Sequence, residues 1–216
     1  ESLQKQLGMD VLPEHIECFD NSNIQGTNPV SACVVFRNAV PSKKDYRHFK
    51  VKTVVGANDY ATMKEVVNRR YSRMLAENPD DLPQLVVIDG GKGQLAFAYE
   101  ALAELGLTDK LTVIALAERM EEVYMVGDPY PMFIDRNSPA LKVLQQIRDE
   151  AHRFGITFHR KLRSKAQVES VLSSIKGVGE KTAIQLLQQF GSIDNLLANT
   201  NQLKGALQRK VQEQVD

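Results

Sequence analysis

Residues 84–95 read QLVVIDGGKGQL, an apolar run that ends in an acid, two glycines and a lysine. A run without polar alternation predicts a strand that is buried on both faces of a parallel sheet. The glycines let the backbone turn sharply into a helix, and amides at such a turn are suited to binding a phosphate. Asp89 is therefore expected at the mouth of a buried strand, with Lys92 as a candidate phosphate ligand. The stretch is not a Walker A loop, because its lysine comes too early and no Ser or Thr follows.

Three strand-like runs precede this stretch and read HIECFDNSNI, SACVVFRNAV and DYRHFKVKTVV. Turn-forming residues at 26–29 and 41–43 separate them, which predicts an antiparallel meander. The next segment, NDYATMKEVVNRRYSRMLAE, has helical spacing, and either Asn58 or Asp59 is suited to its N-cap.

The segments that follow the opening stretch alternate between helix and strand. They are the helical GQLAFAYEALAELG, the buried strand LTVIALAE, the hairpin-like EEVYMVGDPYPMFID and a helix from about residue 138 to 154. This order predicts an α/β fold, a mixed sheet with helices on both faces. We read the basic HRKLRSK, residues 159–165, as a linker to a small all-helical unit. The expected domains are residues 1–160 and 161–216.

The formal charges cancel, because 27 Lys and Arg residues stand against 27 Asp and Glu residues. A neutral chain argues against a generic nucleic-acid binder. From Arg160 onward, however, nine basic residues stand against five acidic ones. This asymmetry indicates a larger part suited to metal chemistry and a basic tail suited to a polyanion. Cys18 and Cys33 lie in apolar runs and are expected to be reduced core residues.

No stretch approaches the roughly 18 apolar residues that span a bilayer, and no charged-then-apolar leader opens the chain. A cytoplasmic setting without a membrane partner is therefore the expectation. The chain opens at Glu1 without an initiator Met and stops within a helical pattern, so we expect a fragment of a longer protein.

Two acids are placed to form a metal site. Asp20 ends the first strand-like run and Asp89 ends the fourth, so parallel neighbouring strands would bring both to the sheet edge where ligands bind. At ~5 Å and an effective dielectric constant near 20, their repulsion is roughly 3 kcal/mol, which a divalent cation would relieve. Oxygen ligands favour Mg²⁺ or Mn²⁺.

The segment RDEAHRFG, residues 148–155, supplies the third component. On a helical wheel His152 lies at the border of the buried face, on the same side as Arg148. A neutral imidazole there would complete the ligand set, and Arg148 or Arg153 would hold a phosphate bidentately. Asp59 is either a fourth acidic member or a helix-capping carboxylate.

The tail motif SSIKGVGEKTAIQLLQQFGS predicts a glycine hairpin followed by a helix that begins near Glu180. Backbone amides at Gly177 and Gly179, with the side chains of Lys176 and Lys181, would contact DNA phosphates without reading sequence. The alternative is an ordinary packing hairpin. A second, weaker copy of the motif follows it.

With these residues identified, the chain closely resembles the C-terminal half of the UvrC family, the incision subunit of bacterial nucleotide excision repair. Matching stretches run almost end to end: IECFDNSNIQG, YRHFKVKTV, NDYATMKEVVNRRY, LVVIDGGKGQL, IRDEAHRFGITFHR and IKGVGEKTA. The resemblance implies a ribonuclease H-like endonuclease domain followed by tandem helix-hairpin-helix motifs. It also implies a catalytic triad of Asp20, Asp89 and His152, with Asp59 matching an additional family aspartate.

The function implied by this resemblance is a metal-dependent DNA endonuclease that cuts on the 5′ side of a lesion. Its implied partners are damaged, bubble or junction DNA and, for the full-length protein, the UvrB–DNA complex. Two alternatives stay open: a ribonuclease acting on RNA–DNA hybrids, and a non-catalytic DNA-binding scaffold.

Overall fold

The structure is a computed structural model, and it describes residues 1–22, 29–54, 58–117, 122–175, 177–203 and 205. The chain divides into two compact units, Glu1–Thr157 and Phe158–Asp216. Among the described residues, no helix combines the length and the hydropathy that crossing a bilayer requires.

The described residues of the first unit form one mixed sheet of seven strands. The strands are β1 (His15–Ser22), β2 (Val30–Arg37), β3 (Val40–Pro41), β4 (Arg47–Lys50), β5 (Leu85–Asp89), β6 (Thr112–Ala117) and β7 (Glu122–Met125). Their order is β3-β2-β1-β5-β6-β7, and β4 also pairs with β2. The pairs β1–β5 and β5–β6 are parallel, and the other pairs are antiparallel. The predicted mixed sheet is confirmed.

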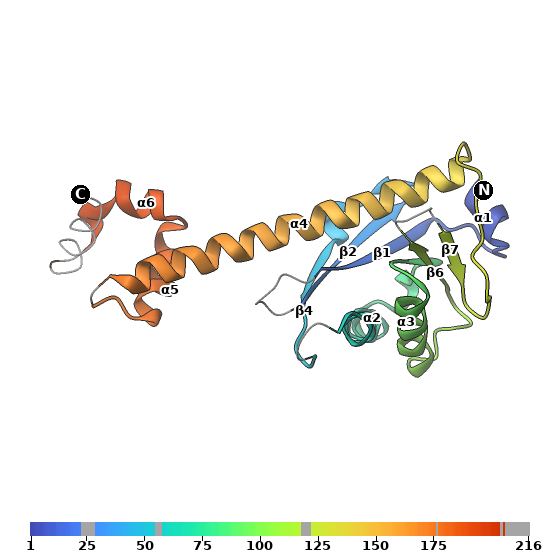
Figure 1. The fold of residues 1–216 in the computed structure, drawn as a ribbon, viewed down its shortest axis with the longest axis horizontal. Helices are drawn as coiled ribbons and strands as arrows, with labels where there is room; N and C mark the ends of the chain where they lie inside the picture. Colours follow the sequence, from blue (N-terminus) through green and yellow to red (C-terminus); the bar gives the residue numbers. More distant parts are fainter. Residues whose placement is uncertain (23–28, 55–57, 118–121, 176, 204, 206–216) are drawn as a thin grey trace. The chain divides into compact units, whose positions relative to one another are not determined.

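Helices cover both faces of this sheet. They are α1 (Ser2–Leu7), α2 (Asp59–Glu77), α3 (Lys92–Glu104) and the first part of α4 (Pro139–Ser174). Figure 1 shows α2 and α3 on one face, with α4 running across the other. Short 3₁₀ turns occupy Lys43–Asp45 and Pro79–Asp81.

Alternate side chains of the central strands feed two hydrophobic cores. On β5, Leu85 and Val87 pack on the α4 side, whereas Val86 and Ile88 pack against α2 and α3. Because successive positions point to opposite faces, Asp89 points to the same side of the sheet as Val87, the α4 side.

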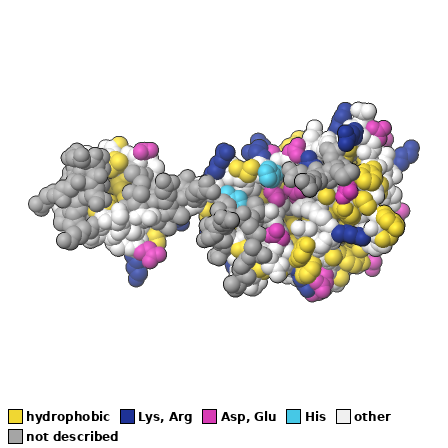
Figure 2. Space-filling model, in the orientation of Figure 1, with side chains coloured by type: hydrophobic (Ala, Val, Ile, Leu, Met, Phe, Trp, Pro, Cys, Tyr) yellow, Lys and Arg dark blue, Asp and Glu magenta, His cyan; other side chains and the backbone are white. Residues whose placement is uncertain are grey.

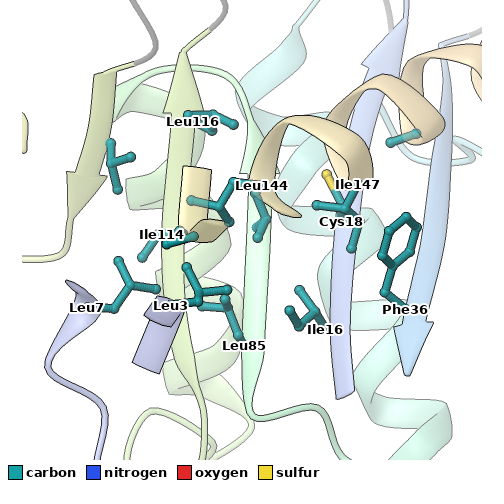
Figure 3. Packing of buried hydrophobic residues seen from close by; sticks show 14 of the residues in the cluster. Leu3, Leu7, Ile16, Cys18, Phe36, Leu85, Ile114, Leu116, Leu144 and Ile147 are labelled. Atoms are coloured by element: carbon teal, nitrogen blue, oxygen red, sulfur yellow. The ribbon is translucent and has the colours of Figure 1, made fainter. Parts of the chain in front are cut away.

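Cys18 and Cys33 are buried free cysteines, as the sequence predicts. They belong to different cores, Cys18 to the α4 side and Cys33 to the α2 and α3 side. Figure 3 shows Cys18 on β1 beside Ile147 of α4.

One local expectation, the turn at 41–43, was right only in part, because the chain turns both before β3 and after it, at Lys43–Asp45. The chain turns after β2 at Asn38 and Ala39, which both have positive φ (52° and 62°), and Pro41 lies within β3 rather than in the turn. A left-handed turn without glycine gives little signal in a sequence. The short α1 was not predicted. Of the turn expected at 26–29, only Pro29 lies within the described residues.

The helix expected to end near residue 154 continues as α4 to Ser174, so HRKLRSK is helical. This segment contains neither glycine nor proline, and its Lys, Arg and Leu are good helix formers that need no apolar face to continue a helix. The expected helix end near residue 154 was therefore wrong, whereas the role of this segment as the connection to a second unit stays a prediction.

The second unit adds α5 (Glu180–Phe190), α6 (Ile193–Ala198) and a 3₁₀ turn at Thr200–Gln202 to the end of α4. Its small core contains Leu172, Ile175, Val178, Ala183, Leu186, Leu196 and Leu203. The small helical unit that the sequence predicts is therefore present.

Candidate metal centre

The register of β1 and β5 positions two carboxylates side by side. Phe19 pairs with Ile88 in the parallel ladder, so Asp20 and Asp89 follow at neighbouring positions. Asp20 is in line with Cys18, and Asp89 with Val87, both of which face the α4-side core. Both carboxylates therefore lie on the α4 side of the sheet, next to the end of its apolar core.

The third side chain comes from α4. Leu144, Ile147 and Ala151 are fully buried against the sheet, and His152 directly follows the last of them with a 61% exposed side chain. Its Nδ1 atom lies 3.5 Å from Oδ2 of Asp20. One ligand atom from each of Asp20, Asp89 and His152 lies within 4.8 Å of the others.

The donor set fits a divalent cation. Two carboxylates this close repel each other, and water screens the repulsion weakly because the Asp20 side chain is only 8% exposed. Burial raises the pKa of Cys18, and Asp89 and Asp20 raise it further, so the thiol beneath them stays neutral. The donors are therefore two carboxylate oxygens and an imidazole nitrogen, with no thiolate among them.

Asp59 lies outside this group of three. Asn58 is the N-cap of α2, since its side chain accepts a hydrogen bond from the amide of Ala61, and Asp59 is the exposed first residue of the helix. The backbone oxygen of Asp59 accepts a hydrogen bond of 3.1 Å from Nδ2 of Asn21. Asn21 directly follows Asp20 in β1 and was not among the predicted site residues. Its side chain thus links the start of α2 to β1.

Arg148 and Arg153, the two arginines of α4 nearest to His152 in the sequence, differ in their surroundings. Arg148 has a 13% exposed side chain that bonds Asp149, and its buried Nη1 has no hydrogen-bond partner among the described residues. Arg148 also acts electrostatically on Cys18, as do both site aspartates. Arg153 is 56% exposed and makes two bonds of 2.7 Å to Glu150. Arg148 is therefore the arginine that lies toward the carboxylates.

The backbone amides of the two glycines after Asp89 bind other groups than expected. The amide of Gly90 donates to the carbonyl of Leu116 on β6, and that of Gly91 donates to the side chain of Gln94. These two amides are satisfied within the protein, so the expectation that they face a phosphate was wrong. The Nζ of Lys92 donates to the backbone oxygen of Pro129 at 2.8 Å.

In the second unit, the glycine hairpin precedes α5 as predicted. Gly177 has a positive φ of 93°, and Gly179 is the N-cap of the helix. Lys181 is exposed in the first turn, whereas the structure does not describe Lys176. The first amides of α5 therefore follow directly on the hairpin.

The fold and the site together define a ribonuclease H-like α/β domain that presents two carboxylates and a histidine to a metal ion. A family model described as the UvrC RNase H endonuclease domain matches residues 4–156. The chain belongs to this family.

Curated relatives agree with this assignment. The chain is 59% identical over 194 residues to UvrABC system protein C of Flavobacterium johnsoniae, covering 90% of the chain and 32% of that protein. It is 51% identical over 217 residues to the protein of the same name from Chlorobaculum tepidum, covering 100% of the chain and 34% of the relative. The chain thus spans about a third of the length of the curated relatives it matches.

Solved structures are more distant. An Endonuclease V of Ciona intestinalis in complex with DNA aligns with a TM-score of 0.36 and 18% identity, over 62% of this chain and 53% of that one. Human Endonuclease V aligns with a TM-score of 0.30 and 14% identity, over 49% and 46% of the two chains. The fold assignment rests on the sheet order and the family model instead.

Proposed function

We propose that this chain is a divalent-metal-dependent DNA endonuclease, the part of an excision nuclease that makes the 5′ incision at a damaged site. The observation that carries the proposal is the convergence of Asp20, Asp89 and His152, with one ligand atom of each within 4.8 Å of the others. Membership of the UvrC endonuclease domain family supports the same activity.

In this proposal Asp20 and Asp89 supply negative oxygen ligands, and His152 supplies a neutral ring nitrogen for Mg²⁺ or Mn²⁺. When bound, the ion stabilises negative charge on the scissile phosphate and lowers the pKa of a bound water. The paired strands β1 and β5 hold the carboxylates in place, so little reorganisation is needed when the phosphate arrives. The cut leaves a 5′-phosphate and a 3′-hydroxyl.

Arg148 is the preferred phosphate contact beside the metal ligands, since its guanidinium is largely buried and retains an unused donor among the described residues. Its planar fork matches two phosphate oxygens. Arg153 and Lys92 are weaker candidates, because Glu150 and the Pro129 carbonyl already accept from them. The additional acid Asp59 has a supporting role near the DNA.

Residues 161–216 form the proposed DNA-holding domain, and residues 1–160 the endonuclease domain. Lys176, Gly177, Gly179 and Lys181 grip the phosphate backbone without reading bases. The proposed substrate is a damaged duplex with a bubble or junction, delivered in the full-length protein by a UvrB–DNA complex. Action on the chromosome implies a location in the bacterial cytoplasm.

A nicking assay tests the proposal. The chain is incubated with Mn²⁺ and a labelled bubble duplex, and it is compared with Asp20→Asn, Asp89→Asn and His152→Ala. Each substitution should lower the nicking rate by at least about 100-fold, which corresponds to about 2.7 kcal/mol. The exposed Asp109→Asn, in the turn after α3, is the matched control and should cut normally.

Two outcomes contradict the proposal. Equal nicking by Asp89→Asn and the unsubstituted chain would leave a DNA-binding scaffold as the better reading. Faster cutting of an RNA–DNA hybrid than of bubble DNA would make the chain a hybrid-specific ribonuclease.

A further inference from the structure

A cavity of about 590 Å³ lies beside the turn that carries Asp89. One wall is the first two turns of α3, and the other is the segment that follows β7. Its lining residues are Lys92, Gly93, Leu95, Ala96, Tyr99, Met125, Val126, Gly127, Asp128 and Pro129. The volume is in the usual range for small-molecule binding sites.

Exposed apolar side chains surround this cavity. Tyr99 and Val126 in its lining are 36% and 42% exposed, and Tyr130 and Phe133, which follow the lining residue Pro129 in the sequence, are 78% and 61% exposed. Figure 2 shows hydrophobic side chains gathered over α3 and the segment after β7, with a basic side chain among them. An apolar patch kept exposed on a folded domain marks a binding surface.

The short segment that carries Tyr130 is held on both sides. The Nζ of Lys92 bonds the carbonyl of Pro129, and Val123 and Met132 exchange two backbone hydrogen bonds of 3.0 and 2.8 Å. Tyr130 lies between these two fixed points. Its ring is therefore presented on a preorganised backbone, which reduces the entropy lost when a ligand binds.

The cavity is coupled to the metal site through the backbone. Lys92 begins α3 three residues after Asp89, and the intervening Gly90 donates to Leu116 of β6. The segment after β7 continues from the strand paired with β6. One wall of the cavity thus belongs to the same turn as a proposed metal ligand.

The charge of the lining selects the kind of ligand. The lining contains one cation, Lys92, and one anion, Asp128, and its other residues are uncharged. A surface for several phosphates would need an excess of cations. A neutral, flat group with hydrogen-bond donors and acceptors fits better, and exposed aromatic rings stack on such groups irrespective of sequence.

We propose that this cavity and the rings of Tyr130 and Phe133 receive an unpaired nucleobase next to the incised phosphate. The inference rests on the proposed function, because it takes bubble or junction DNA as the substrate. It adds a reason for selecting such DNA: only a base that has left the duplex can enter the cavity and stack there.

The test removes the base and the rings separately. Binding of the chain to bubble DNA is measured by fluorescence anisotropy without metal, with an abasic site at each unpaired position in turn. One abasic position should weaken binding about 10-fold, a typical loss for a single stacked base. The double variant Tyr130→Ala and Phe133→Ala should bind intact bubble DNA as weakly as the unsubstituted chain binds the abasic DNA. The abasic site should not weaken the binding of this variant any further.

A matched control removes exposed apolar groups elsewhere. Val11→Ala with Val40→Ala, at positions 55% and 61% exposed, should keep the full abasic effect. Circular dichroism checks that each variant folds. An abasic scan without any sensitive position, or an equal abasic effect in the ring variant, overturns the inference.

A failure of the base-binding proposal can be distinguished from a failure of the proposed nuclease function. Asp89→Asn should lose nicking yet keep the abasic effect, whereas the ring variant should still nick in Mn²⁺ at saturating DNA. Persistent nicking by Asp89→Asn would refute the nuclease site and leave the base-binding result to be judged on its own.

Discussion

Nδ1 of His152 lies 3.5 Å from Oδ2 of Asp20, although one residue belongs to the last helix of the first unit and the other to its first strand. Contacts on either side of His152 fix this turn of α4. The hydroxyl of Tyr46 donates to Glu150 at 3.0 Å, and its ring meets that of Phe154 edge to face. The imidazole therefore reaches the carboxylates through helix packing rather than through a flexible loop, and rigid elements hold ligands with the greatest precision.

Arg148 and Arg153 of α4 should differ in function. Arg148→Met removes a buried guanidinium donor from a proposed phosphate contact, so nicking at subsaturating DNA should fall by about 10- to 100-fold, the loss expected for a charged hydrogen bond. Arg153→Met removes a group already bound to Glu150 and should change this rate by less than about 3-fold. Steady-state nicking kinetics with both variants measures the difference, and equal losses would contradict the assignment.

Gly93 is required by a neighbouring ring. A Cβ atom at this position would lie 2.4 Å from Cε1 of Tyr60, whose ring stacks on Phe97. Gly93→Ala should therefore destabilise the chain by about 1 kcal/mol, because Tyr60 is exposed and can shift. Urea unfolding measures the change.

A double variant isolates the cause of that change. In a Tyr60→Ala background, Gly93→Ala should cost nothing or stabilise slightly, because alanine is the better helix former. An undiminished cost in that background would mean that the backbone, and not the ring, requires glycine.

Glu17 should make the stability of the fold depend on pH in acid. This fully buried carboxylate accepts hydrogen bonds from Arg70 at 2.6 and 3.1 Å. Burial alone raises its pKa, but hydrogen bonds from His15 and Arg70 outweigh burial and lower the pKa from 4.5 to about 2. A lowered pKa stabilises the fold above the unfolded-state pKa, so this stability is present above about pH 4.5 and is lost as the pH falls through about 2.

Removing the partner of Glu17 tests this account. Arg70→Met should cost about 3–5 kcal/mol at pH 7, because a buried carboxylate loses its arginine, and this cost should shrink as the pH falls and Glu17 takes up a proton. The exposed Arg73→Met on the same helix, which breaks a surface pair with Glu77, should cost less than about 1 kcal/mol. Urea unfolding between pH 7 and 2 provides the measurement, and a cost of Arg70→Met that does not change with pH would refute the role of Glu17.

The two hairpin glycines should separate folding from DNA binding. Gly177→Ala places a side chain at a φ of 93° and should destabilise the helical unit by about 1 kcal/mol. Gly179→Ala has an ordinary φ of −79° and free space around its Cβ, so the unit should fold normally. If a phosphate approaches the amides of α5, this methyl group should weaken duplex binding by about 10-fold. Unchanged binding would identify the hairpin as a packing element.

The main features of the site follow from local patterns. Two apolar runs that each lead to an acid predicted parallel neighbours, and the ladder between β1 and β5 confirms that pairing. Helical periodicity predicted His152 at the edge of the buried face, where its 61% exposure now locates it. Both inferences succeed because burial imposes the periods 2 and 3.6 on a sequence.

Features without an apolar period were missed or misread. The second half of α4 is helical although its basic residues carry no apolar stripe, and the turn at Asn38 and Ala39 uses positive φ without glycine. The partners of the Gly90 and Gly91 amides are likewise set by tertiary neighbours, which no local pattern encodes. Such features depend on which elements pack together and not on the residues beside them.

The most direct test of the metal centre is anomalous diffraction from crystals soaked in Mn²⁺. The account predicts a peak in contact with Asp20, Asp89 and His152, absent from the same crystals of Asp89→Asn. A peak that avoids all three side chains, or one that persists unchanged in the variant, would contradict it.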